Sequence, residues 1–401
     1  MRRIDLAAFV VAGSATILIA ADQGSYFERS WPWVGLGLAA TGALALLAPA
    51  EVRAGRAAVT LVAATVTISL WTLVSWLWSA EPPTTLQEAL RAPIYVAAAV
   101  TFVTLAGMGG SLGVACGVAA GTTALAGYAL ADRGLAQSQG KLLAEPLGYA
   151  NALGGLCAIG FVIVAVLGWR VRKNAALAGV AAAAAAVLVA ALSLTSSRGS
   201  WTALVAALVV VFAGAMRVRA AVAVVAALVG VSVLTAFTTA PRLLQARGDY
   251  WHSAWRVAEH HPLGGSGAGT FDLGWAAYGD LTRWGEALDA HNLYLETLAE
   301  LGIVGLVLVL GLLVPAAAAL RSDRLPAGAW AALAGAVAYL VHAGLDWDWE
   351  MPAVTVAGIA CLSAACSGPA GVLGARARTT LLGLEGSVIV TYVAYLIAHN
   401  V

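Results

Sequence analysis

Charged residues are scarce in this chain of 401 residues: Asp, Glu, Lys and Arg together make up 11%, against about 25% in a typical soluble domain. The 22 Lys and Arg nearly balance the 21 Asp and Glu, so no basic surface is available for nucleic acid. Hydrophobic residues make up 61%. This composition excludes a disordered chain, a cytosolic Rossmann-type enzyme and a secreted disulfide scaffold. It indicates a polytopic membrane protein.

Cysteine is also scarce, and its positions give no sign of a disulfide or metal site. The four cysteines lie in apolar surroundings without CxxC spacing: Cys116, Cys157, Cys361 and Cys366. We interpret them as small buried hydrophobic residues. The N-terminus shows no cleavable signal peptide, because Met1-Arg2-Arg3 and the apolar run at 4–21 are followed at once by further apolar runs. This run therefore predicts a first membrane helix.

Long apolar runs recur along almost the whole chain. A helix needs about 20 apolar residues to cross the hydrocarbon core. The last run contains Glu385 and two glycines and is compatible with an interfacial helix, so we expect twelve or thirteen spans in one integral membrane domain, residues 1–401. The predicted fold class is all-α. The predicted spans lie at 4–21, 33–50, 57–78, 93–107, 112–130, 148–168, 175–194, 202–215, 220–238, 301–320, 326–344, 353–367 and 381–398.

Basic residues gather in alternate short loops, which sets the expected orientation. By the positive-inside rule these loops face the cytoplasm. Most acidic residues and all six histidines then fall outside or at outer helix ends. One outer segment, 239–300, is long enough to build a site, and we expect it to be an extracytoplasmic loop that carries much of the active site. The basic residues assigned to the inside are Arg2, Arg3, Arg53, Arg56, Arg170, Arg172, Lys173, Arg217, Arg219, Arg321, Arg324, Arg376 and Arg378.

The segment 195–201, Thr-Ser-Ser-Arg-Gly-Ser-Trp, joins two predicted helices at the outer face. An arginine at this depth is costly unless it meets an anion or a carboxylate. Ser197 and the neighbouring serines favour an anion pocket around Arg198. The alternative is an interfacial arginine that extends to lipid head groups, with Trp201 in an aromatic belt.

Residues 249–262 predict a short helix that Asp249 caps and that ends before Pro262. Trp251 and Trp255 share one face of this helix, whereas Arg256 lies on another face together with two histidines. If the apolar face packs on the bundle or on the membrane surface, Arg256 points into the remaining cleft. A solvated polar face is the alternative.

The segment 263–270, Leu-Gly-Gly-Ser-Gly-Ala-Gly-Thr, is rich in glycine. It lacks the Lys-Ser/Thr of a P-loop and follows no strand of a βαβ unit, which argues against a nucleotide site. A turn that lets the backbone approach a ligand and a plain flexible turn both remain open.

Residues 289–302 hold the strongest candidate for a general base. Asp289 is predicted as an N-cap, which places His291 in the first helical turn at the water–membrane boundary. A histidine there can titrate near neutral pH and act as a base, although a structural histidine is the alternative. Because Leu295 stands at the position four residues after His291, metal binding is not expected.

The segment 342–352 predicts a short outer loop with three carboxylates, Asp346, Asp348 and Glu350, and two tryptophans. Aromatic rings beside carboxylates suit the binding of sugar rings. They also suit an ordinary aromatic belt at the membrane interface.

Taken together, these motifs resemble the O-antigen ligase/O-antigen polymerase superfamily of membrane glycosyltransferases. The resemblance implies a helical membrane fold of the GT-C class, with about twelve spans and one large outer loop between the ninth and the tenth. The matching segments are Ser-Arg-Gly at 197–199, the run at 250–271, His-Asn-Leu-Tyr-Leu-Glu at 291–296 followed by Glu-Leu-Gly at 300–302, His342 to Asp346, and Pro-Leu-Gly-Tyr-Ala-Asn at 146–151.

The resemblance also implies the reaction and its residues. The implied donor is a glycan on undecaprenyl diphosphate, transferred outside the bacterial cytoplasmic membrane to a glycan, lipid or other envelope acceptor, without nucleotide, cofactor or metal. The family's essential arginines fall on Arg198 and Arg256, which would hold the diphosphate in place of a metal, and its essential histidine falls on His291, the base for an inverting displacement. The further substrate-binding candidates are Ser197, Trp255, Asn292, Tyr294 and Asp346.

Two activities fit this constellation, since a ligase and a polymerase need the same diphosphate site and base. A ligase passes a completed glycan to a distinct acceptor, whereas a polymerase extends lipid-linked repeat units. A transporter would place charged residues within broken helices at the middle of the membrane. Few such residues are present, because Asp5 and Glu385 lie near the chain ends, which argues against transport.

Overall fold

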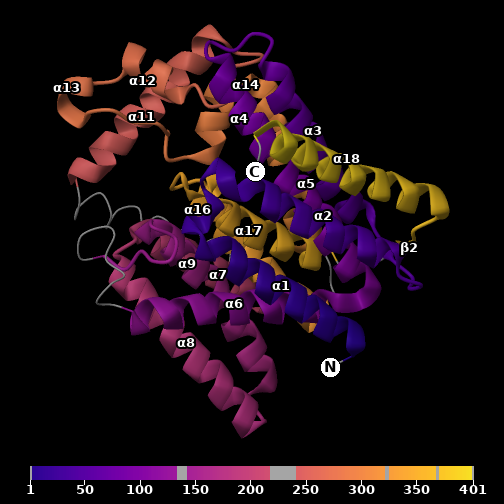
Figure 1. Cartoon of the computed structure of the whole chain (residues 1–401). Coiled ribbons are helices and arrows are strands. Elements are labelled where there is room, and N and C mark those ends of the chain that lie inside the picture. The colour runs from indigo at the N-terminus through magenta and orange to yellow at the C-terminus, as the bar shows by residue number, and fades with distance from the viewer. Residues whose placement is uncertain (1, 133–141, 217–240, 321–324, 367–369, 400–401) are drawn as a thin grey trace.

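The computed structural model describes residues 2–132, 142–216, 241–320, 325–366 and 370–399, and the described chain is almost entirely helical. The helices pack into one bundle, with α11, α12 and α13 beside α14 at one end (Figure 1). The α-helices are α1 (Arg3–Ala21), α2 (Trp31–Leu47), α3 (Arg56–Ser75), α4 (Pro82–Arg91), α5 (Pro93–Leu105), α6 (Ser111–Ala131), α7 (Ala150–Val171), α8 (Ala175–Thr195), α9 (Arg198–Met216), α11 (Pro241–His260), α12 (Phe271–Tyr278), α13 (Leu281–Trp284), α14 (Leu293–Leu310), α15 (Leu313–Leu320), α16 (Ala327–Ala343), α17 (Pro352–Ala365) and α18 (Ala375–His399).

Short elements join the helices at their ends. Among them are η1 (Gln23–Ser25), η2 (Glu28–Ser30), η3 (Ala106–Gly110) and η4 (Asp348–Glu350). Two short strands, β1 (Arg53–Ala54) and β2 (Gly371–Val372), pair antiparallel, with Arg53 opposite Val372.

The predicted spans coincide with helices wherever the structure describes them. Eight helical segments of the described chain are long and apolar enough to cross a membrane. One of them, Pro82–Ala131, contains two of the predicted spans, and three shorter apolar helices at α9, α16 and α17 contain three more. The predicted span at 220–238 lies outside the described residues. The protein is thus an all-α polytopic membrane protein, and the count of twelve or thirteen crossings stays a prediction.

Small residues allow close packing of the bundle. A Cβ atom on Gly113 of α6 would lie 2.0 Å from the carbonyl oxygen of Asp5, and one on Gly117 would lie 2.5 Å from the carbonyl oxygen of Phe9 on α1. Only glycine permits such contact between helix backbones, which is how helices associate in lipid without a hydrophobic driving force.

Helix α18, which covers the last predicted span, packs against α2 and α5. Its Glu385 is fully buried, and Thr101 of α5 donates a hydrogen bond to it at 3.3 Å. The acidic side chain therefore faces the bundle rather than lipid, as is usual for ionisable residues in membrane helices. Glu385 does not prevent α18 from being apolar enough to cross a membrane.

The glycine-rich segment is a turn that is tightly attached to its neighbours. The backbone N–H groups of Ser266 and Gly267 donate to the carbonyl groups of Ala299 and Glu300 on α14, at 3.1 and 2.8 Å. Gly265, Gly267 and Gly269 have φ of 69°, 107° and 72°, a region that L side chains rarely adopt. The close approach observed here is to α14, and approach of this turn to a ligand stays a prediction.

Candidate active site

Asp346 is the centre of a polar cluster at one end of the bundle. Its carboxylate, with a residue exposure of 1%, accepts hydrogen bonds from the Tyr149 hydroxyl at 2.6 Å and from Asn151 Nδ2 at 2.7 Å. Arg247 Nη2 of α11 forms an ion pair with it at 2.9 Å. The loop after α16 thereby joins the start of α7 to α11.

Arg256, which the sequence predicts as a site residue, does not lie in the Asp346 cluster. Arg256 pairs with Glu259 of its own helix at 2.6 Å and lies over the Tyr278 ring at 5.8 Å. The neighbouring Trp255 is 52% exposed and donates from Nε1 to Glu259 at 2.9 Å. The structure therefore brings Arg247, and neither Arg256 nor Trp255, to Asp346.

The sequence did not single out Arg247, because the helix predicted there began only at Asp249. The prediction that Asp249 caps this helix is wrong, since α11 begins at Pro241 and includes Arg247. Gly248 does not interrupt the helix, although glycine lowers helix propensity. Extending the amphipathic pattern upstream would have put Arg247 on the buried face with Ala254 and Val257.

His291 lies immediately before α14 in a left-handed conformation, with φ of 54°. The prediction that Asp289 caps this helix is wrong, because Asn292 is the cap: its Oδ1 accepts from the backbone N–H groups of Tyr294 and Leu295 at 3.0 and 3.1 Å. His291 is therefore held in a turn rather than in the first helical turn. Tyr294, another substrate-binding candidate, donates its hydroxyl hydrogen bond to the carbonyl group of Leu340 at 2.9 Å.

The surroundings of His291 favour a neutral imidazole. Tyr250, one turn after Arg247 on α11, stacks on its ring with centroids 5.6 Å apart. Burial lowers the pKa of His291 below its ordinary value of 6.5; the Asp346 charge raises it, and the Arg247 charge lowers it. Nδ1 contacts the Asp289 carbonyl oxygen at 3.3 Å, and within the described chain Nε2 has no hydrogen-bond partner. A neutral ring that donates from Nδ1 leaves Nε2 free to accept a proton.

Arg198 is the first residue of α9 and is exposed. No described residue forms an ion pair with its side chain. The serines beside it are buried: Ser200 Oγ lies 2.7 Å from Ser197 Oγ and 3.3 Å from the carbonyl oxygen of Asn151. Because Asn151 also binds Asp346, the Arg198 turn and Arg247 belong to one connected region. Ser197 itself contacts this hydroxyl network.

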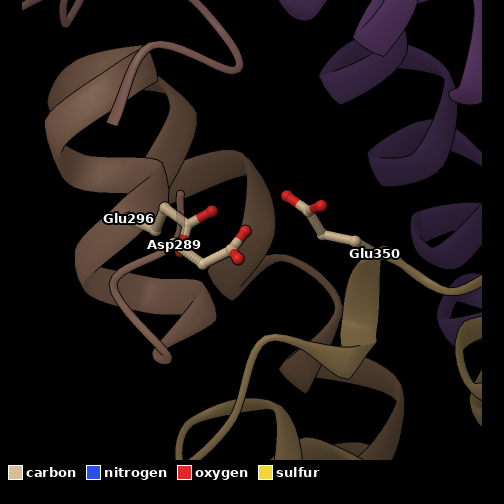
Figure 2. Close-up of side chains that lie close together, drawn as sticks. All are labelled: Asp289, Glu296 and Glu350. Atoms are coloured by element: carbon tan, nitrogen blue, oxygen red, sulfur yellow. The ribbon is translucent and has the colours of Figure 1, made fainter. Parts of the chain in front are cut away.

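Three carboxylates converge beside this region, from Asp289, Glu296 and Glu350 (Figure 2). One ligand atom of each lies within 4.8 Å of the others, so they are the described group whose spacing suits a cation. Glu296 accepts from the backbone N–H of Ala290 at 2.8 Å, and Arg91 Nη1 lies 3.3 Å from Glu350. Burial, then the charges of Glu350 and Glu300, raise the pKa of Asp289. Helix spacing does not reveal this cluster, because its members lie before α14, on α14 and on η4.

A cavity of about 110 Å³ lies between α3, α5, α14, α16 and α17. Its wall is mostly apolar, with Ile68, Leu293 and Leu301 among its residues, and Arg91 and Glu88 line it as well. Those two side chains pair with each other.

The fold and the site define a polytopic helical membrane protein whose arginines and histidine gather at one end of the bundle. Residues 183–310 match the family model described as O-antigen ligase. The match reaches from α8 to the end of α14 and includes Arg198, Arg247, Arg256 and His291. The match confirms the predicted resemblance to the O-antigen ligase superfamily within this segment. No curated protein matches the chain.

Proposed function

We propose that this protein transfers a glycan from undecaprenyl diphosphate to an acceptor hydroxyl at the outer face of the bacterial cytoplasmic membrane, with inversion and without a metal ion. The observation that carries the proposal is the placement of Arg247, which Asp346 holds one helical turn from the tyrosine that stacks on His291. Arg247, Tyr250 and His291 lie inside the segment that matches the O-antigen ligase family, and Asp346 lies outside it.

Arg247 and Arg198 suit a diphosphate leaving group. A guanidinium carries five N–H donors and stays charged. Within the described chain Arg247 uses Nη2 for Asp346, so its other donors remain available to phosphate oxygens. Arg198 is exposed beside the same network. Together they supply the positive charge that offsets the charge developing on the diphosphate as its bond to the sugar breaks.

His291 suits the role of base. The acceptor oxygen attacks the anomeric carbon as His291 Nε2 takes its proton, and the bond from that carbon to the diphosphate oxygen breaks, with its electron pair leaving on undecaprenyl diphosphate. The neutral imidazole that this step needs is favoured by burial, which lowers the pKa of His291. Attack from the face opposite the leaving group inverts the anomeric centre.

Arg256, which the resemblance assigns to the diphosphate site, remains the alternative to Arg247. In the structure it pairs with Glu259 rather than with the Asp346 cluster. The outer location of α11–α13 rests on the distribution of basic residues along the chain. A polymerase, which would use a lipid-linked repeat unit as donor and a growing chain as acceptor, is the second candidate, because the same leaving group and base serve it.

The test is to incubate purified protein with lipid-linked oligosaccharide and candidate acceptors. Label moving to an acceptor that carries no prenyl chain would indicate a ligase, and growth in chain length would indicate a polymerase. Arg283→Ala is a matched control, since this arginine is exposed and its side chain contacts Gln245 and the Trp284 ring, away from the Asp346 cluster. A stable wild-type protein that moves no glycan under either condition would contradict the proposal.

A further inference from the structure

We propose that His342 is a positioning residue that holds the two donor-binding arginines, Arg198 and Arg247, at a fixed separation. The inference rests on the function proposed above and adds a residue to it. His342 lies near the end of α16, four residues before Asp346, and is 1% exposed.

A buried chain of hydrogen bonds passes through the imidazole. Nε2 of His342 lies 2.9 Å from Ser200 Oγ on α9, and Nδ1 lies 3.1 Å from Asp348 Oδ1 on η4. Ser200 and Asp348 are both 0% exposed. One ring therefore links α9 to α16 and η4, which lie more than 100 residues further along the chain.

Each end of this chain leads to one arginine. Ser200 stands in the first turn of α9, which begins at Arg198, and bonds to Ser197 at 2.7 Å. At the other end, Asp348 lies two residues after Asp346, whose carboxylate holds Arg247. Since both attachments are buried and hydrogen-bonded, the imidazole sets the distance between the start of α9 and the loop that anchors α11.

Two glycines of α7 pack directly against these hydrogen-bonded side chains, which therefore have no room to move. A Cβ atom on Gly155 would lie 3.0 Å from His342 Nδ1 and 3.2 Å from Asp348 Oδ2, and one on Gly154 would lie 2.6 Å from Ser200 Oγ. Oδ2 of Asp348 also lies 3.1 Å from His342 Nδ1 and has no other polar partner among the described residues. The buried Asp348 side chain therefore depends on His342, and loss of the ring would leave it unsatisfied.

Serine, histidine and aspartate bonded in this order also form the proton relay of serine hydrolases. Here the three side chains are buried, which gives Ser200, His342 and Asp348 a different role. Ser200 is fully buried and hydrogen-bonded to its neighbours, so its hydroxyl cannot meet a glycan. His342 is likewise closed to an acceptor. These three hydrogen-bonded side chains affect the reaction only through Arg198 and Arg247.

The experiment compares His342→Asn with Tyr339→Phe. Tyr339 lies one turn earlier on α16, is 3% exposed and bonds to Thr355 at 3.2 Å, so its variant loses a buried hydrogen bond outside the chain. We expect His342→Asn to raise the donor KM about tenfold or more and to leave the acceptor KM unchanged. Tyr339→Phe should keep both values, since a general loss of packing does not single out the donor.

Coupling provides the second readout. If His342 acts through Arg247, the double variant His342→Asn/Arg247→Lys should lose less donor affinity than the product of the two single losses. A stable His342→Asn protein with the wild-type donor KM, or losses that multiply, would overturn the inference. If His342→Asn does not fold, Ser200→Ala removes the end of the chain with little change in volume, and a wild-type donor KM in that variant overturns it equally.

Direct binding separates this inference from the proposed function. Undecaprenyl diphosphate without a glycan serves as the probe, with undecaprenyl monophosphate for comparison. Weaker diphosphate binding by His342→Asn than by Tyr339→Phe would support the positioning role even if the wild type moved no glycan, a result that would contradict the transfer reaction alone. Equal diphosphate binding by the two variants would contradict the positioning role, as would a wild type that binds no diphosphate.

Discussion

Arg247 and Arg256 lie nine residues apart on α11 and therefore on opposite faces of that helix, because nine residues make about two and a half turns. Arg247 reaches across to Asp346, whereas Arg256 pairs with Glu259 of its own helix. Two arginines of one helix thus meet different surroundings, and their variants should behave differently.

Arg247→Ala should lose donor binding, because each charge-assisted hydrogen bond to the diphosphate is worth about 1.5–3 kcal/mol. Arg247→Lys should restore only part of it, since lysine lacks the planar fork. Arg256→Ala should stay close to wild type, because it breaks an exposed pair. Donor KM and direct binding of the lipid diphosphate measure the difference. Normal affinity in a stable Arg247→Ala protein, with loss in Arg256→Ala, would restore the sequence-based choice.

Arg198→Ala should also lose donor affinity, with Arg283→Ala as the exposed control. Arg198 makes no ion pair with the described residues, so its removal leaves no protein charge unpaired and should leave thermal stability unchanged. Donor binding and thermal unfolding, measured on the same preparation, check both parts. Loss of stability without loss of donor affinity would show that Arg198 serves the fold.

His291→Asn should retain donor binding and lose turnover by about 10²–10⁴-fold, the usual contribution of a general base. Asparagine suits the substitution because it tolerates the left-handed conformation that His291 adopts. Single-turnover rates and donor binding give the two values. Near-normal turnover in a folded His291→Asn protein would remove this residue from the mechanism.

Turnover at saturating donor should fall at a pH below 6.5, the ordinary pKa of histidine. A base works only when deprotonated, and burial lowers the pKa of His291, so the protein stays active to lower pH than a solvent-exposed histidine would allow. Asp346 raises this pKa, so Asp346→Asn should move the midpoint further toward acid. The pH dependence of kcat in both proteins tests this; a shift toward neutral pH in the variant would contradict the assignment.

Transfer should continue in a strong chelator, because arginines supply the charge that a divalent ion would otherwise provide. The carboxylates of Asp289, Glu296 and Glu350 make this a sharp test, since their spacing suits a cation. Glu296→Gln removes one of them while keeping its size. Loss of activity in chelator, restored by one particular metal and absent in Glu296→Gln, would assign a metal to this cluster.

Apolar length and turn chemistry made the helices predictable from the sequence. The breaks at Ser196–Ser197 and before Pro352 were equally visible, because hydroxyl and proline residues interrupt apolar runs there. Helix starts were harder to place: Asp249 and Asp289 resemble N-caps, but α11 runs through the first and Asn292 caps α14 instead of the second.

The site was only partly predictable, for a physical reason. His291, Arg198 and Asp346 lie in recognisable motifs. Arg247 lies in none of them, and it can be identified as a site residue only from the face of α11 on which it lies. Partners such as His342 with Ser200, or Glu350 with Asp289, come together through helix packing across long stretches of sequence. Periodicity within one helix does not encode those distances.

The glycine turn after α11 also determines where the chain can change in length. Its backbone is bonded to Ala299 and Glu300 on one side and to Ala80 on the other, so an inserted residue there would push α11 away from α14 and separate Arg247 from His291. The stretch around Gly285 and Glu286 is exposed, and a side chain on Gly285 would meet open space. An insertion between Gly285 and Glu286 would therefore lengthen an exposed part of this loop and leave Arg247 and His291 in place.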